Sequence, residues 1–201
     1  MTPRERAIFD TYKNQDNQKG KHAFSLRPFE KDAALSGIEC KGYLARRTGT
    51  LFVHYEIIGS SLRIDIPERK QEPSRRKGLW ENTCLELFFA VKDCDHYWEF
   101  NLSPSGDWNV FRFEHYRNEG YADKLREEPL VASLPFRTQR RSGSFLLDME
   151  FDLDKLVRED QFLEIGIGAI LKFDKDRTYR ALTHCASRPD FHRRDSFIIE
   201  L

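Results

Sequence analysis

Apolar and polar residues alternate with a period of two along most of the chain, a pattern typical of half-buried β-strands. Clusters of Gly, Pro, Asp, Asn and Ser lie between the alternating segments and favour turns. The pattern predicts strands over residues 51–58, 62–66, 83–91, 97–102, 108–115, 145–151, 163–173, 179–184 and 196–201. Residues 67–78 and 116–135 are charged and favour loops, and residues 154–159 favour a short helical turn.

The period of two argues against a helical bundle, and the absence of amphipathic helices between the strands argues against a parallel α/β sheet. The sequence therefore predicts an all-β fold, an antiparallel β-sandwich of the immunoglobulin or jelly-roll type with little helix. A chain of 201 residues suits one domain, which we expect to span residues 21–201. The polar residues 1–20 are expected to form a flexible or helical N-terminal extension.

Composition narrows the class of partner. Lys and Arg number 33 and Asp and Glu number 33, so the formal net charge is zero. This balance excludes bulk attraction to nucleic acid or to a membrane surface as the main activity. The sequence has no long apolar run and no apolar segment behind its first residues, so we expect neither a membrane span nor a secretory signal. None of the four cysteines forms a CxxC pair, so we expect free thiols and a cytoplasmic location. The sequence leaves the oligomeric state open.

The alternation also assigns the faces of three central strands. Residues 85, 87, 89 and 91 are apolar and should enter the core, which places Glu86 on the other face. We assign six residues to this non-core side of the sheet: Glu86, Tyr97, Glu99, Asn101, Trp108 and Arg112. Such an aromatic and hydrogen-bonding surface suits a neutral polar ligand. The alternative is a solvated outer face with ordinary cross-strand pairs.

Two parts of the sequence resemble DOMON-like domain proteins, a mostly uncharacterised bacterial group. They are residues 78–89 with 97–108, and the C-terminal residues 179–184 with 188–197. The resemblance covers residues 25–201. This group is similar in turn to family 9 carbohydrate-binding modules and to haem- or sugar-binding DOMON domains. The resemblance implies a β-sandwich with a ligand site on one sheet and no enzymatic activity.

Family 9 modules place a tryptophan and, six residues later, a carboxylate at the sugar, and Trp80 and Glu86 have that spacing. The resemblance implies that Trp80 stacks on the ligand and that Glu86 accepts its hydroxyls. A second stacking tryptophan near the C-terminal strands is missing, and only Tyr179, Phe191 and His192 are found there. The expected function is therefore a non-catalytic module that binds a carbohydrate or a similar polyhydroxylated small molecule. Its expected ligand-binding residues are Trp80, Glu86, Tyr97, Asn101, Trp108, Arg112 and His184.

Two alternatives stay open. A haem-binding DOMON domain in electron transfer would need Met and His ligands, but Met149 falls on a predicted core face, and a pair of His184 with His54 has no supporting spacing. Without haem, we expect no cofactor. The second alternative is a protein-interaction module.

The C-terminal segment and two glycines complete the predictions. His184, Cys185 and His192 lack the short spacing of a metal site, so we expect no metal, and no catalytic motif is present. We expect the loop after residue 184 to border the ligand site instead. Gly166 and Gly168 lie on one strand face, where they should allow close approach of a ring or a ligand.

Overall fold

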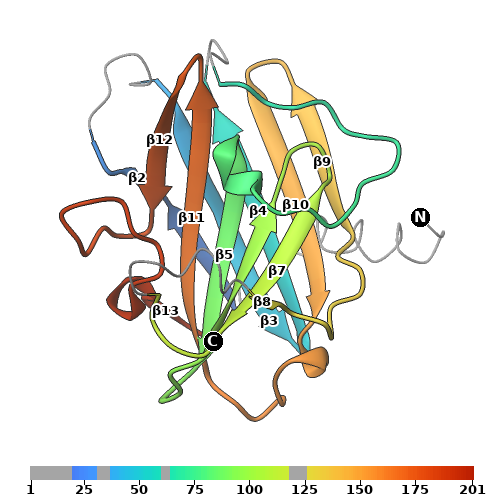
Figure 1. Cartoon of the computed structure of the whole chain (residues 1–201), viewed down its shortest axis with the longest axis vertical. Coiled ribbons are helices and arrows are strands. Elements are labelled where there is room, and N and C mark those ends of the chain that lie inside the picture. The colour runs from blue at the N-terminus through green and yellow to red at the C-terminus, as the bar shows by residue number, and fades with distance from the viewer. Residues whose placement is uncertain (1–19, 31–36, 60–63, 118–125) are drawn as a thin grey trace.

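The computed structural model describes residues 20–30, 37–59, 64–117 and 126–201 of the chain. These residues form two antiparallel sheets packed face to face, with β11, β5 and β7 in front and β4, β10 and β9 behind in Figure 1. The predicted all-β antiparallel sandwich is confirmed. The expected N-terminal extension lies outside the described residues, apart from Gly20.

Five strands in the order β1-β3-β4-β10-β9 form the first sheet, called sheet A here. Each pair is antiparallel, and β4 runs along β10 over nine residue pairs, from Thr50–Asp152 to Ile58–Ser144. The strands are β1 (Lys21–Ser25), β3 (Glu39–Arg47), β4 (Thr50–Ile58), β9 (Phe136–Arg141) and β10 (Ser144–Asp152). A short 3₁₀ turn, η4 (Leu153–Lys155), follows β10 where the sequence favours a helical turn.

The second sheet, called sheet B, has eight strands in the order β2-β12-β11-β5-β6-β7-β8, with β13 also paired to β11. Its strands are β2 (Arg27–Pro28), β5 (Cys84–Val91), β6 (Tyr97–Leu102), β7 (Trp108–Phe113), β8 (Arg126–Glu127), β11 (Leu163–Phe173), β12 (Asp176–Ala181) and β13 (Ile199–Glu200). Two 3₁₀ turns lie near this sheet, η2 (Leu79–Glu81) before β5 and η5 (Arg194–Ser196) before β13.

The main core lies between the inner faces of the two sheets. Alternate residues of each central strand face it, as the period of two requires. Leu87 and Phe100 of sheet B are fully buried there, as is Leu147 of sheet A, and Phe100 meets Phe151 edge to face at 4.8 Å. The predicted core face of residues 145–151 is therefore confirmed.

A second apolar layer covers the outer face of sheet B. Phe88, Tyr97, Phe111 and Phe113 are buried there in one cluster with Phe191 and Phe197. A Cβ atom at Gly168 would lie 2.7 Å from the ring of Phe191, and one at Gly166 would lie 2.7 Å from that of Phe197. The predicted close approach of rings to these two glycines is confirmed, and it lets the C-terminal segment lie flat on the sheet.

Several predicted element boundaries were wrong. The predicted strand over residues 62–66 lies partly outside the described residues, and Ile64 and Ile66 are buried in an irregular segment instead. Strands β1, β3 and β9 were not predicted. Strand β9 is half-exposed and polar, FRTQRR, so its apolar alternation is weak. Within the described ranges, no helix has the length and apolar character needed to cross a membrane.

Candidate functional site on the outer face of sheet B

Polar side chains lie buried among the rings on the outer face of sheet B. A row of directly paired residues runs across four strands, from Gly168 on β11 through Glu86 and Asn101 to Asn109 on β7. Opposite residues of an antiparallel pair share a face, so these side chains point the same way. We call the following residues the outer-face cluster: Trp80, Glu86, Tyr97, Glu99, Asn101, Asn109, Phe111, Arg117 and His192.

Hydrogen bonds connect most of the buried polar members. The amide of Asn101 donates to Glu99 Oε1 at 2.8 Å, and its Oδ1 lies 3.4 Å from the thiol of Cys84. The hydroxyl of Tyr97 lies 2.9 Å from Nδ1 of His192, whose Nε2 is 3.7 Å from Glu99 Oε2. His192 thereby attaches the C-terminal segment to strand β6.

Glu86 differs from its neighbours. The residue is 3% exposed, and its Oε1 has no hydrogen-bond partner among the described residues. On one side its strand neighbour is Gly168, which offers no side chain. On the other side Asn101 uses its amide group on Glu99. The described part of the fold therefore offers this buried carboxylate oxygen no donor, an arrangement that native proteins rarely tolerate unless a ligand or water supplies one.

Burial dominates the electrostatics of the cluster. Desolvation and the nearby charge of Glu99 raise the pKa of Glu86 well above its usual range, against the attraction of Arg117. Desolvation raises the pKa of Glu99 to about 7, although the Asn101 hydrogen bond and Arg117 oppose it. Desolvation and Arg117 hold the pKa of His192 well below its ordinary value, so its imidazole is neutral at pH 7.

Trp80 lies at the edge of this cluster, on η2. Gly78 adopts a left-handed backbone conformation with φ of 72° and starts the turn. The half-buried indole packs against Phe111 of β7 with ring centroids 5.9 Å apart, and the backbone carbonyl of Trp80 accepts a hydrogen bond from Arg177 at 3.2 Å. The indole therefore lies on the same face as Glu86, as expected.

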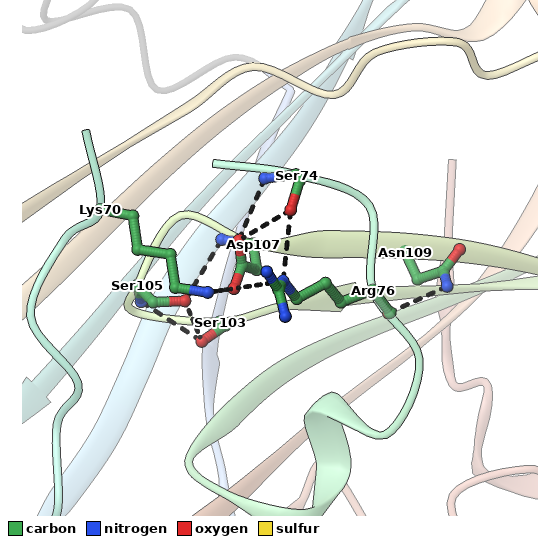
Figure 2. A network of polar contacts seen from close by, with 7 residues as sticks. All are labelled: Lys70, Ser74, Arg76, Ser103, Ser105, Asp107 and Asn109. Atoms are coloured by element: carbon green, nitrogen blue, oxygen red, sulfur yellow. Dashed lines mark hydrogen bonds and ion pairs between the residues drawn. The ribbon is translucent and has the colours of Figure 1, made fainter. Parts of the chain in front are cut away.

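A polar network holds the loop that leads to Trp80. Figure 2 shows Asp107, in the turn between β6 and β7, accepting from Lys70 Nζ at 2.5 Å and from the backbone N–H of Ser74 at 3.0 Å. Arg76 Nε lies 3.5 Å from the same carboxylate, and Asn109 donates to the carbonyl of Arg76 at 2.9 Å. The carboxylate of Asp107 is buried, so it orders residues 70–76 from inside the fold.

Two expected site residues lie on the wrong face. Trp108 pairs with Leu102 and Arg112 with Trp98, and both partners belong to the inner face of sheet B. The predicted placement of Trp108 and Arg112 beside Glu86 is therefore wrong. Trp108 is covered by the guanidinium of Arg75 at 4.6 Å from its ring centroid. Both faces of β7 are buried, so the apolar character of its residues does not distinguish the inner face from the outer face, and the prediction chose the wrong one.

His184 also lies away from the cluster. Its Nε2 is 2.8 Å from the carbonyl of Arg27, and its ring meets Phe29 edge to face at 5.2 Å, at the β2 edge of the sheet. The other residues considered for haem are separate as well. Met149 is buried in the main core, and His54 lies on sheet A with its Nδ1 2.6 Å from Asp148. Within the described ranges, no three His, Cys, Asp or Glu side chains converge as metal ligands.

Of the expected residues, the structure brings Trp80, Glu86, Tyr97 and Asn101 onto one face. It adds residues that were not among the expected ligand-binding set: Glu99, Asn109, Phe111, Arg117 and His192. Pairing with Glu99 and Asn101 identifies Phe111 and Asn109 once the register of β7 is known. Arg117 lies beyond the end of β7 in a segment without periodicity, so no pattern in the sequence marks it. The C-terminal loop covers the cluster through Phe191 and His192.

Comparisons with known proteins bear on the fold. No protein-family profile matches the chain, and no curated protein is similar to it in sequence. Among solved structures, a provisionally assigned carbohydrate-binding protein from Bacteroides uniformis is similar, with a TM-score of 0.62 and 13% identity over 96% of this chain and 88% of that one. A family 9 carbohydrate-binding module from Caldicellulosiruptor kristjanssonii, in complex with cellotriose, has a TM-score of 0.54 and 8% identity over 84% of this chain and 75% of that one. The chain thus has the β-sandwich fold of a family 9 carbohydrate-binding module.

Proposed function

We propose that the outer-face cluster binds a carbohydrate or a similar polyhydroxylated small molecule, and that the protein is a non-catalytic binding module. The observation that carries this proposal is the buried Oε1 of Glu86, which has no hydrogen-bond partner in the described ranges and lies on a face lined with aromatic rings. A buried acceptor without a donor costs about 1–3 kcal/mol, which a ligand that donates a hydrogen bond would recover. Sugar hydroxyls are donors of this kind.

The aromatic residues around Glu86 support the same ligand class. Trp80 packs against Phe111 on the β7 side of Glu86. Phe191 covers Gly168 on the β11 side and meets Tyr179 edge to face at 6.2 Å. Rings therefore flank the carboxylate on both sides, and a sugar ring offers flat apolar faces to such side chains. Tyr179 and Phe191 take the place of the second tryptophan that the family 9 pattern would require.

The sequence and the fold agree with this proposal. The resemblance of residues 78–89 and 97–108 to DOMON-like proteins supports a ligand site on one sheet. The shared sandwich of the cellotriose-bound family 9 module supports oligosaccharides as the first ligands to test. Trp80 and Glu86, the two residues that match the family 9 spacing, lie on the same face of sheet B.

Titration calorimetry with cellotriose, accompanied by tryptophan fluorescence, tests the proposal. Trp98 and Trp108 lie on the inner face of sheet B, so a ligand on the outer face should change the emission of Trp80. Trp80→Ala should lower the affinity at least about tenfold, equivalent to about 1.4 kcal/mol, whereas the matched variant Trp108→Phe should retain it. If no oligosaccharide of a panel binds, or if Trp80→Ala binds unchanged, the proposed site is wrong.

A further inference from the structure

The outer-face cluster contains two buried carboxyl groups, Glu86 and Glu99, and less positive charge than would neutralise both. Glu99, the second buried carboxylate of the cluster, lies diagonally across the β5–β6 pair, because it is paired with Phe88. Glu99 is 5% exposed and Glu86 is 3% exposed, so water screens neither charge well. Two carboxylates in such a place favour either a shared proton or a bound cation.

Arg117, the arginine of the outer-face cluster, also forms an ion pair with Asp190. Arg117 Nη2 lies 3.8 Å from Asp190 Oδ1, and the Arg117 side chain is 46% exposed, so solvent weakens its effect on the buried carboxylates. Asp190 itself accepts from Tyr116 at 2.5 Å and from the backbone N–H of His192 at 3.0 Å. Arg117 therefore balances Glu86 and Glu99 only in part.

Among the residues that the structure describes, the other groups that face the carboxylates add no positive charge at pH 7. Cys84 of β5 and Tyr97 of β6 have raised pKa values, because burial disfavours their ionised forms and nearby carboxylates add to this, so both are neutral. His192 from the C-terminal segment is neutral because its pKa is lowered by burial and by Arg117. On the inner side, the Tyr55 hydroxyl donates to the backbone carbonyl of Glu86 at 2.8 Å and leaves the carboxylate untouched.

Resting on the proposed function, we infer that the outer-face cluster prefers a carbohydrate with a free amino group, whose ammonium lies between Glu86 and Glu99. An ammonium has three donors and a full charge, so it satisfies the free Oε1 and offsets the second carboxylate. A sugar hydroxyl could donate a hydrogen bond to Oε1 of Glu86, but it would not neutralise the negative charge of the two carboxylates. An N-acetyl group could also donate this hydrogen bond without neutralising the charge, and it is bulkier. The rings of Trp80 and Phe191 contact the flat faces of this sugar, as in the proposed function.

The inference predicts a linked release of protons. At pH 7 the carboxyl groups of Glu86 and Glu99 are partly protonated, because the pKa of Glu99 is about 7 and that of Glu86 is also raised. A bound ammonium stabilises both ionised carboxylates and displaces that proton. Below about pH 5 the carboxylates are protonated, and the preference for the amine should disappear.

Three β-1,4-linked trimers that differ at one substituent provide the test: the glucosamine trimer, the N-acetylglucosamine trimer and cellotriose. Calorimetry on the full chain at pH 7 should show the glucosamine trimer binding at least about tenfold more tightly than the other two. Its binding enthalpy should depend on the ionisation enthalpy of the buffer, which reports proton release. Glu86→Gln should reduce the ratio of glucosamine-trimer affinity to cellotriose affinity to about twofold or less, and the control Glu150→Gln, on sheet A, should keep that ratio.

The possible outcomes distinguish the proposed carbohydrate binding from the inferred preference for an amino group. If the three trimers bind with equal affinity and Trp80→Ala weakens all of them, the amine preference is overturned and the binding module stands. If the preference survives in Glu86→Gln, the assigned place of the ammonium is wrong. If no trimer binds, both proposals are overturned together.

Discussion

The hydroxyl of Tyr97 lies 2.9 Å from Nδ1 of His192, and this contact joins two segments that are 95 residues apart in the sequence. Both side chains are buried, and Phe113 lies against them, stacked on Tyr97 with centroids 4.8 Å apart. The contact holds the C-terminal segment over the outer face of sheet B. The segment therefore belongs to the candidate site as well as to the fold.

Tyr97→Phe should destabilise the protein by about 1–3 kcal/mol, because it leaves a buried imidazole nitrogen without its partner. Thermal unfolding at pH 7 measures the effect. Tyr116→Phe is the matched control, since Tyr116 is 40% exposed and water can replace the hydrogen bond that its hydroxyl donates to Asp190. Equal melting temperatures for Tyr97→Phe and Tyr116→Phe would show that the Tyr97 contact contributes little to stability.

The sequence predicts the strands that alternate cleanly and fails where both faces of a strand are buried. Residues 97–102 were placed correctly, because Trp98, Phe100 and Leu102 alternate with polar or amphipathic residues. The inner face of β7 was misassigned because Phe111 and Phe113 are more apolar than Trp108 and Arg112. Trp80 packs on Phe111 and His192 packs on Phe113, and both partners are distant in the sequence, so no local pattern could reveal this burial.

The candidate site also combines residues that a local sequence pattern identifies with residues that only the tertiary structure brings to it. The spacing of Trp80 and Glu86 and the alternation of β5 and β6 could be recognised in the sequence. His192 and Arg117 could not, because one comes from an irregular loop and the other from a segment without periodicity. Their position depends on tertiary contacts such as that of His192 with Tyr97.

The glycines of β11 offer a second test of how the C-terminal segment lies on the sheet. Gly168→Ala would place a methyl group 2.7 Å from the ring of Phe191, and the ring would have to move. Overpacking of this kind costs about 1–3 kcal/mol, so the melting temperature should fall.

Gly37→Ala is a suitable control for this glycine, because a Cβ there meets no atom within 4 Å. Adding Phe191→Leu to Gly168→Ala should recover part of the lost stability, since a smaller side chain relieves the clash. Unchanged stability in Gly168→Ala would mean that Phe191 does not press on β11.

Asp107 allows the support of Trp80 to be tested separately from ligand contact. Asp107→Asn retains an acceptor for the N–H of Ser74 but loses the charged partner of Lys70 and Arg76. We expect a loss of about 1–2 kcal/mol and faster tryptic cleavage among the basic residues 69–77. Asp160→Asn should do neither, because the ion pair of Asp160 with Arg158 is more than 70% exposed on both sides. Slow cleavage in Asp107→Asn would show that other contacts hold the loop.

The pH dependence of stability tests the burial of Glu99 directly. Its pKa is raised by desolvation from the ordinary 4.5 to about 7 in the folded protein. Above pH 7 the carboxylate is ionised in both the folded and the unfolded chain, and the folded state bears a cost of about 3 kcal/mol. As the pH falls from 7 toward 4.5, the folded state takes up the proton first and this cost disappears.

Glu99→Gln removes the charge while keeping an oxygen that can accept from Asn101. The variant should therefore melt roughly 5 °C or more above the wild-type protein at pH 8, and the difference should shrink to near zero at pH 4.5. Protonation of His192 in the unfolded state destabilises both proteins below about pH 6.5, so it cancels in the comparison. Glu39→Gln, at a side chain that is 67% exposed, should track the wild-type protein throughout. A Glu99→Gln variant that is less stable than the wild-type protein at pH 8 would show that the ionised carboxylate is satisfied in the folded state, and the cation preference of the cluster would lose its basis.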